Sequence, residues 1–237
     1  MVQYNGWIGI PEPYANGLFA QAGFDSVTFD CQHGAFDERA LAVSLQALKA
    51  PKRLVRVLWN EPALIGKALD LGADGVIVPL VNSAAEARRL AEACRYPPKG
   101  NRSFGPGPAA LKAPGEPYAS LADHIEAWAM IETREALEAV EAIAGTPGVD
   151  GLYVGPNDLA LSLGLGPGSN REEPEILAAL ARIDRAAKAA GKLSGVFCTT
   201  PAYARRMAAL GFDMVTTAAD AVVFADAARR ILQEARG

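Results

Sequence analysis

The stretch Gly72-Ala-Asp-Gly-Val-Ile-Val-Pro79 joins a glycine and an aspartate to a short apolar run, and the chain contains this phrase four times. The other copies are Gly23-Phe-Asp-Ser-Val-Thr-Phe-Asp30, Gly148-Val-Asp-Gly-Leu-Tyr-Val-Gly155 and Gly211-Phe-Asp-Met-Val-Thr-Thr217. Glycine ends a helix by adopting a left-handed conformation, aspartate favours a turn, and a β-branched run suits a strand buried on both faces. Each copy therefore predicts the end of one helix and the start of one strand.

Further short apolar runs lie at residues 7–10, 53–57, 127–132 and 193–198, and they bring the expected strands to eight. Alanine-rich helical patterns follow most of these strands. Parallel strands that alternate with helices over 237 residues predict one (β/α)8 TIM barrel spanning residues 1–237. A doubly wound open sheet is the alternative, but its first strand is more often followed by a glycine-rich loop than by Gly9-Ile-Pro-Glu-Pro13.

The composition excludes several classes of protein. The net charge is −4 with acidic and basic residues interspersed, so no basic patch favours a nucleic-acid partner. No apolar run approaches the roughly 20 residues of a membrane span, and the first residues do not resemble a signal peptide. Three widely spaced cysteines, Cys31, Cys94 and Cys198, fit a reducing cytoplasm better than a disulfide framework. We therefore expect a cytoplasmic protein.

Polar side chains that can take part in catalysis or ligand binding stand where the expected strands end. Phe29-Asp-Cys-Gln-His-Gly34 follows the second strand, Arg56 lies on the third, Glu132 ends the fifth, and the sixth runs into Gly155-Pro-Asn-Asp158. In a (β/α)8 barrel the active site lies at the carboxyl ends of the strands. The remaining strands end in residues that are expected to shape a pocket: Pro11, Pro79, Thr199 and Thr217.

Glu132 and Asp158 form a candidate metal site, because neighbouring strand ends bring two carboxylates within reach of one ion. Oxygen ligands without cysteine or a second histidine suit Mg²⁺ or Mn²⁺. In a structural alternative, Asp158 is a helix N-cap and Glu132 an exposed strand terminus. In a third, the pair is the acid and nucleophile of a glycosidase, although a chain with only 7% aromatic residues is a poor sugar binder.

His33 and Arg56 are the other candidates for chemistry. His33 is one of two histidines, and its place between a strand end and a glycine favours proton transfer over a structural role. Arg56 lies within an apolar run, where a guanidinium needs an anionic partner such as a substrate oxyanion, unless it forms a core ion pair. Cys31 is expected to fill space rather than act as a nucleophile.

Five motifs stand in one order along nearly the whole chain: Phe29-Asp-Cys-Gln-His-Gly34, Leu54-Val-Arg56, Arg95-Tyr-Pro-Pro-Lys-Gly100, Met130-Ile-Glu-Thr133 and Val154-Gly-Pro-Asn-Asp-Leu159. Their succession resembles the HpcH/HpaI aldolases, the metal-dependent class II pyruvate aldolases of aromatic and sugar-acid catabolism. These include 4-hydroxy-2-oxoheptanedioate and 2-keto-3-deoxy-sugar-acid aldolases. The resemblance implies a pyruvate-binding (β/α)8 barrel that assembles as a homo-hexamer, a dimer of trimers, with the C-terminal helix exchanged between subunits.

The resemblance also implies roles for matching positions. Glu132 and Asp158 would be the ligands of Mg²⁺ or Mn²⁺, with Co²⁺ or Zn²⁺ as alternatives. Arg56 would stabilise the enolate of pyruvate or another 2-oxo acid, and His33 with Asp30 would be the acid–base group for the reaction with an aldehyde.

Other matching positions would contact substrate. The backbone of Gly155 and Asn157 would hold the pyruvate carboxylate, and Gln32 and Trp7 would contribute to substrate binding. Asp70 matches an acidic position that lies near the site at a subunit contact in relatives.

Three positions depart from the family pattern. Gln32 stands where many members have glutamate, Met130 where relatives often have glutamine, and Asn157 where a small residue is common. These changes bear on the substrate more than on the mechanism. A Schiff-base aldolase is disfavoured, because no lysine has a buried position at a strand end.

Two functions from other classes remain open. One is a related lyase that forms an enolate from an acyl-CoA thioester of the citramalyl-CoA or malyl-CoA type. The other is a barrel that binds a keto acid without turning it over.

Overall fold

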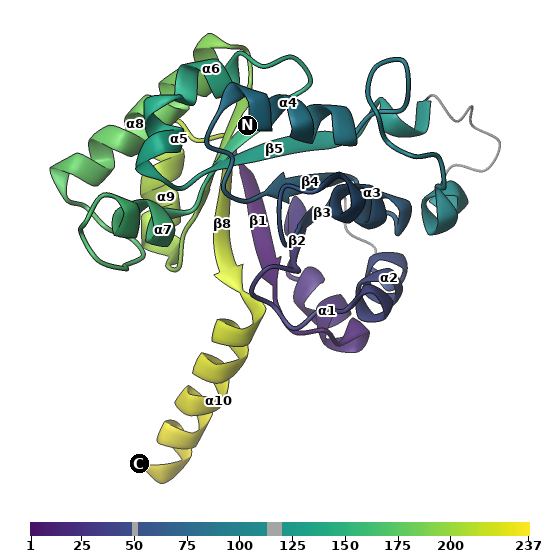
Figure 1. Ribbon diagram of the computed structural model, residues 1–237. Helices are drawn as coiled ribbons and strands as arrows, with labels where there is room; N and C mark the ends of the chain where they lie inside the picture. Colours follow the sequence, from purple (N-terminus) through teal and green to yellow (C-terminus); the bar gives the residue numbers. More distant parts are fainter. Residues whose placement is uncertain (49–51, 113–119) are drawn as a thin grey trace.

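The computed structural model of the chain describes residues 1–48, 52–112 and 120–237, and its centre is a closed barrel of parallel strands (Figure 1). Each strand pairs with the next in sequence, and the last pairs with the first. The (β/α)8 barrel predicted from the sequence is confirmed. Its strands are β1 (Gln3–Ile8), β2 (Ser26–Asp30), β3 (Arg53–Arg56), β4 (Gly75–Val78), β5 (Glu126–Ile131), β6 (Gly151–Val154), β7 (Leu193–Phe197) and β8 (Met214–Ala219).

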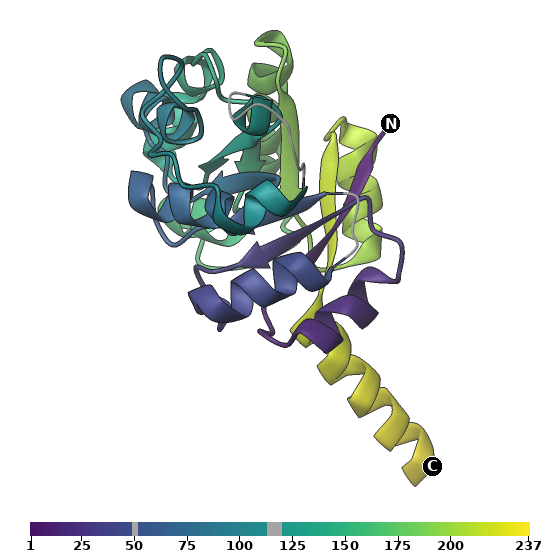
Figure 2. The ribbon, with the colours of Figure 1, turned by 90° about the vertical axis from the view of Figure 1, so that its right-hand side faces the viewer.

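Helices surround the barrel, except for α10, which leaves the carboxyl end of β8 and projects away from the other elements (Figures 1 and 2). In the described part of the chain, no helix is long and apolar enough to cross a membrane. The α-helices are α1 (Pro13–Ala20), α2 (Glu38–Ala47), α3 (Pro62–Asp70), α4 (Ala84–Ala93), α5 (Arg134–Glu138), α6 (Val140–Ala144), α7 (Pro156–Ser162), α8 (Pro174–Ala189), α9 (Pro201–Leu210) and α10 (Asp220–Arg236), and short 3-10 helices cover Gly107–Lys112 and Ser120–Ala122.

The glycine of each repeated phrase has the predicted left-handed backbone. The φ angles are 90° at Gly23, 110° at Gly72, 88° at Gly148 and 120° at Gly211. Residues with a Cβ rarely adopt this region, so glycine turns the chain toward the next strand. Gly211 is itself the C-cap of α9, whereas Gly148 lies beyond Gly145, the C-cap of α6.

The aspartate of each phrase has a more specific role than the turn predicted for it. Its carboxylate accepts the backbone N–H of a residue at the start of the preceding strand. The four bonds are Tyr4 to Asp25 at 2.8 Å, Arg53 to Asp74 at 2.8 Å, Ala127 to Asp150 at 2.8 Å and Ser194 to Asp213 at 2.9 Å.

The first strand lies earlier in the chain than predicted. It was expected at residues 7–10, whereas β1 covers Gln3–Ile8. The backbone N–H groups of Gly9 and Ile10 donate instead to the carboxylate of Asp220, at 2.9 and 3.0 Å. The chain therefore leaves the sheet at this point, because its donors are satisfied by the first residue of α10.

Large side chains fill the barrel beneath its carboxyl end, and glycines on neighbouring strands make room for them. A Cβ on Gly151 would lie 2.3 Å from the ring of Trp128, and one on Gly195 would lie 2.7 Å from the ring of Tyr153. The Tyr153 hydroxyl is 2.6 Å from Thr216 Oγ1. This packing gives the residues above it a rigid floor.

Candidate active site

A cavity of about 230 Å³ lies at the carboxyl ends of the strands. Seven of its lining residues are among those predicted from the sequence for the site, and three other predicted residues, Gln32, Asp70 and Glu132, do not line it. The lining residues are Trp7, Asp30, His33, Arg56, Met130, Tyr153, Gly155, Pro156, Asn157, Asp158 and Phe197.

Asp30, at the end of β2, holds Arg56, at the end of β3, in one orientation. Asp30 Oδ1 accepts from Arg56 Nε at 2.9 Å, and Oδ2 accepts from Arg56 Nη2 at 2.5 Å. Trp7 Nε1 also donates to Oδ2, at 3.1 Å, and the Trp7 ring centroid lies 5.0 Å from the guanidinium carbon. Burial alone would raise the pKa of Asp30, but the hydrogen bonds and charge of Arg56 outweigh it, so this pKa is lowered. Asp30 is thus an anion that fixes the guanidinium.

His33 has an exposed side chain at the edge of the cavity. Its backbone N–H and that of Gln32 each donate to Asp30 Oδ1 at 3.1 Å. Asp30 therefore fixes the loop that carries the imidazole rather than bonding the imidazole itself. Gly34 allows this tight loop, because a Cβ there would lie 2.2 Å from the carbonyl oxygen of Asp30.

Glu132 follows β5 and is buried, with 2% of its surface exposed. Its Oε1 accepts the backbone N–H of Leu80 at 2.8 Å. Burial raises the pKa of Glu132, the Leu80 N–H lowers it, and the charge of Asp158 raises it again, to about 7 from 4.5. The carboxylate lies directly behind the cavity wall, because a Cβ on Gly155 would be 2.4 Å from Glu132 Oε2.

Asp158 lies in the first turn of α7 and is exposed to the cavity. The N-cap of α7 is Gly155, so the alternative interpretation of Asp158 as the N-cap is wrong, as is that of Glu132 as an exposed terminus. Pro156, the first residue of α7, has no N–H, and no side chain caps the helix, which leaves the backbone N–H groups of Asn157 and Asp158 open to a ligand.

The carboxylates of Glu132 and Asp158 fit a hard divalent cation. The charge of Asp158 raises the pKa of Glu132, and Glu132 accepts only one hydrogen bond from the described residues. Such a buried charge is costly unless a cation neutralises it. The described residues hold no group of three or more His, Cys, Asp or Glu suited to a metal, so substrate and water oxygens would complete the coordination.

Asn157, at the start of α7, is anchored from outside the cavity. Its Oδ1 accepts from Ser169 Oγ at 3.0 Å. Ser169 belongs to the segment between α7 and α8, and the neighbouring Asn170 donates to Thr199 Oγ1 at 2.6 Å. This segment therefore joins the rim of the site to the end of β7.

Two predicted site residues, Gln32 and Asp70, lie away from the cavity in the structure. Gln32 is partly buried, and its Oε1 accepts no hydrogen bond from the described residues. Asp70 ends α3 and accepts from Arg102 Nη2 at 2.6 Å. Neither side chain forms the cavity wall within its own chain.

Cys31 is a partly buried free thiol. Burial raises its pKa to about 12, which keeps it protonated and poorly nucleophilic. It lines a separate cavity of about 350 Å³ between α2 and α3, together with residues such as Phe36 and Leu64.

Tyr153 and Phe197 line the cavity but were not identified from the sequence. Both flank Trp7: its ring is stacked on Tyr153 with centroids 5.8 Å apart, and it meets Phe197 edge-on at 5.3 Å. Alternation along β6 could have placed Tyr153 inward, two residues before Gly155. Phe197 is the last residue of β7, one step before the Cys198-Thr199 pair at which that strand was expected to end.

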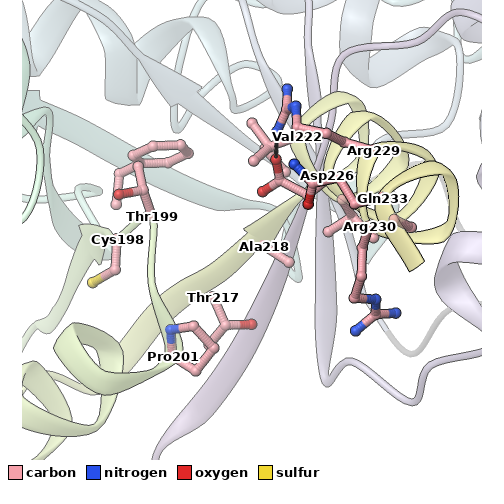
Figure 3. A pocket seen from close by; sticks show the side chains of 14 residues that line it. Cys198, Thr199, Pro201, Thr217, Ala218, Val222, Asp226, Arg229, Arg230 and Gln233 are labelled. Carbon is pink, nitrogen blue, oxygen red and sulfur yellow. Dashed lines mark hydrogen bonds and ion pairs between the residues drawn. The ribbon is translucent and has the colours of Figure 1, made fainter. Parts of the chain in front are cut away.

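A second, larger hollow of about 590 Å³ lies beside the first cavity, between α10 and the ends of β7 and β8 (Figure 3). Thr199 and Thr217, which were expected to shape the active pocket, line this hollow instead. Phe197 borders both spaces, and Arg229 on the helix side is paired with Asp226 at 2.5 Å. The hollow carries no acid–base or metal-binding arrangement comparable to that of the smaller cavity.

The position of the lysines disfavours Schiff-base chemistry. No lysine is among the described residues that line the cavity. Lys52, at the opposite end of the barrel, is paired with Glu126.

Comparisons with known proteins identify the family of this chain. The family model HpcH/HpaI aldolase/citrate lyase matches residues 4–227. A hydroxypyruvate/pyruvate aldolase of Rhizorhabdus wittichii is 40% identical over 233 residues, which cover 98% of this chain and 93% of the relative. A 4-hydroxy-2-oxo-heptane-1,7-dioate aldolase of Salmonella typhimurium is 34% identical, over 95% of this chain and 87% of its own length. The crystal structure of an HpcH/HpaI aldolase/citrate lyase family protein from Burkholderia cenocepacia superposes with a TM-score of 0.92 at 33% identity, covering 100% of this chain and 95% of the other.

Proposed function

Because the chain belongs to the HpcH/HpaI aldolase/citrate lyase family, we propose that it is a divalent-metal-dependent class II aldolase. It makes or cleaves 4-hydroxy-2-oxo acids, using pyruvate or another 2-oxo acid and an aldehyde. The observation that carries this proposal is the pairing of buried Glu132 with Asp158 beside Arg56 and His33 around one small cavity.

Glu132 and Asp158 would hold the cation, with Mg²⁺ or Mn²⁺ preferred by their oxygen ligands and Co²⁺ or Zn²⁺ as alternatives. When bound, such an ion polarises a keto group and makes the neighbouring carbon–hydrogen bond more acidic. The Glu132 pKa of about 7 supports this role, because a cation beside the carboxylate would offset the cost of its burial.

Arg56 is the group that stabilises the enolate oxygen. Its guanidinium donates two hydrogen bonds to the Asp30 carboxylate, which fixes it before substrate arrives, so no reorganisation is needed as negative charge develops. The Trp7 ring beneath the guanidinium holds it from the other side.

We assign to His33 the proton transfer at the oxygen on the aldehyde-derived carbon. In the cleavage direction it takes the proton of the 4-hydroxyl group, and in synthesis it returns that proton. Its exposed position on a loop fixed by Asp30 supports a group that exchanges protons with solvent between turnovers.

The start of α7 is placed to hold the substrate carboxylate. Gly155 and Asn157 line the cavity, and the first N–H groups of the helix have no side-chain cap. Backbone donors of this kind bind carboxylates well.

The decisive experiment follows pyruvate in D₂O with Mg²⁺ or Mn²⁺. We expect exchange of the methyl protons, detected by NMR, and aldol product when a panel of aldehydes is added. Both should disappear on treatment with EDTA and return with metal. Exchange or turnover that survives complete chelation would refute the metal-dependent mechanism.

For the assembly, we propose a homo-hexamer, a dimer of trimers, in which α10 packs on a neighbouring subunit. This helix projects from the barrel (Figure 2). Its exposed apolar side chains support the proposal, with Phe224 at 73% and Ile231 at 63% exposure. Asp70 would then approach a neighbour's site, since it lies off the cavity of its own chain.

Light scattering after size exclusion tests the assembly. We expect Phe224→Asp to give smaller species and the exposed control Glu234→Gln to leave the hexamer intact. An unchanged hexamer in Phe224→Asp would refute the role of α10.

We also infer a cytoplasmic location. All three cysteines are free thiols, as is usual in reducing compartments. Fractionation of cells that produce the protein tests this.

A further inference from the structure

Leu80 has an unusual backbone conformation two residues after β4 ends. Its φ angle is 54°, and only one other non-glycine residue in the described ranges, Asn170, has a positive φ. Asparagine tolerates this region, whereas leucine pays about 1–2 kcal/mol to enter it. Such a residue persists where its surroundings impose the conformation, and such sites cluster around function.

The conformation of Leu80 delivers its N–H to Glu132. The donor lies 2.8 Å from Oε1, between residues 52 positions apart in the chain. This is the only hydrogen bond that the described residues give to the carboxylate. Oε1 is therefore fixed from the β4 side, and Oε2 is left without a described donor.

Gly155 limits the same carboxylate from the β6 side. A Cβ there would lie 2.4 Å from Glu132 Oε2 and 3.0 Å from Met130 Cε. The φ and ψ angles of Gly155 are −94° and 91°, a conformation open to any residue. A Cβ here would therefore force the Glu132 carboxylate to shift, so space rather than backbone geometry favours glycine at this position.

We infer that the Leu80 N–H and the bare Cα of Gly155 form a clamp that aims the Glu132 carboxylate at the cation. This rests on the proposed function, in which Glu132 is a metal ligand. Leu80 and Gly155 are positioning residues, and neither needs its own side chain for the task. Partners that orient a metal ligand in this way are typically worth about 10- to 100-fold in metal affinity.

The clamp predicts an effect on substrate-free metal binding that differs from the effect expected if Gly155 only bound substrate or if the Leu80 side chain mattered. If Gly155 served only to bind the substrate carboxylate, its substitution would leave substrate-free metal binding unchanged. If Leu80 mattered through its side chain, truncation of that side chain would weaken metal binding. Mn²⁺ binding without substrate, followed by electron paramagnetic resonance, separates these cases.

The titration compares wild type with Gly155→Ala, Leu80→Ala and Leu80→Gly. Gly66→Ala is the matched control, because a Cβ on Gly66 in α3 meets nothing within 4 Å. We expect Gly155→Ala to bind Mn²⁺ at least about tenfold more weakly. Both Leu80 variants and Gly66→Ala should stay within about threefold of wild type, since each keeps the N–H at position 80.

A second variant tests the hydrogen bond directly. Replacement of Leu80 by its α-hydroxy acid converts one amide to an ester and deletes only the N–H. We expect this protein also to lose at least about tenfold in Mn²⁺ affinity. It keeps the inference testable if Gly155→Ala fails to fold, which circular dichroism reveals.

The outcomes are distinct. Wild-type affinity in folded Gly155→Ala, or in the ester variant, would overturn the clamp while leaving the proposed function intact. Loss of binding in Leu80→Ala and Leu80→Gly alike would assign the effect to the side chain and also overturn it. Absence of Mn²⁺ binding by wild type would refute the proposed function instead.

Discussion

Replacement of Glu132 by glutamine should stabilise the metal-free protein at neutral and higher pH. The carboxylate is 2% exposed and has a pKa of about 7 in the fold, against 4.5 as its ordinary value. Because the folded-state pKa is the higher one, the folded state binds a proton that the unfolded chain releases. The contribution of Glu132 to the free energy of unfolding is therefore fully present below about pH 4.5 and is lost as the pH rises through 7.

The size of the effect follows from the difference between the two pKa values. A difference of about 2.5 units corresponds to roughly 3 kcal/mol of lost stability above pH 7. Glutamine cannot ionise, and its amide oxygen can still accept from Leu80. Glu132→Gln should thus gain up to about 3 kcal/mol near pH 8, or roughly 6–12 °C in Tm for a chain of this length, and almost nothing near pH 4.5.

Thermal melts in EDTA across this pH range provide the assay, with Glu234→Gln as an exposed control on α10. Addition of Mn²⁺ should reverse the order, because the ion stabilises only a protein that binds it. A metal-free Glu132→Gln protein that is no more stable than wild type near pH 8 would refute the account of Glu132 as a strained, buried anion.

Other consequences can be tested separately. Arg56→Ala leaves the buried carboxylate of Asp30 without its cation and should cost about 3–5 kcal/mol in urea unfolding; a loss below about 1 kcal/mol would contradict the buried pair. His33→Ala removes an exposed side chain and should change stability by no more than about 0.5 kcal/mol, while aldol turnover falls by roughly 10²–10⁴; turnover within a few-fold of wild type would exclude His33 as the base. Among the described residues that line the cavity, Arg56 is the one lysine or arginine, and Asp30 already neutralises it. The carboxylate of an acidic acceptor would therefore find no free cation among these described residues, so kcat/KM for butyraldehyde should exceed that for succinic semialdehyde by about tenfold or more. Equal values would show that a further cation reaches the acceptor. Borohydride with pyruvate should leave the activity intact, and inactivation would point to a Schiff-base lysine.

Local patterns in the sequence were sufficient for the barrel and for most of the site. The glycines of the repeated phrase and the apolar runs after them are signals within a few residues, and the strands follow from them. Asp30, His33, Arg56 and Asp158 stand at strand ends, where the barrel geometry gathers them into one cavity.

The features that could not be predicted from the sequence depend on contacts between residues far apart in the chain. Leu80 has a left-handed conformation and donates to a carboxylate 52 residues away, and nothing near Leu80 in the sequence predicts either. The early end of β1 likewise depends on Asp220, which captures two backbone donors from the other end of the chain. The contribution of Phe197 becomes visible only once barrel closure brings β7 near β1, with β8 alone between them.

The four aspartates that reach back to the preceding strand divide the barrel into quarters. Each joins an odd-numbered strand to the even-numbered strand after it, across sequence separations of only 19 to 23 residues. The ring is therefore a fourfold series of strand–helix–strand modules, each tied at its base by its own local bond. A circular permutant opened at Gly191, between the third module and the fourth, would keep all of these ties within unbroken modules. One opened between β7 and β8 would have to form the last tie between opposite ends of the chain.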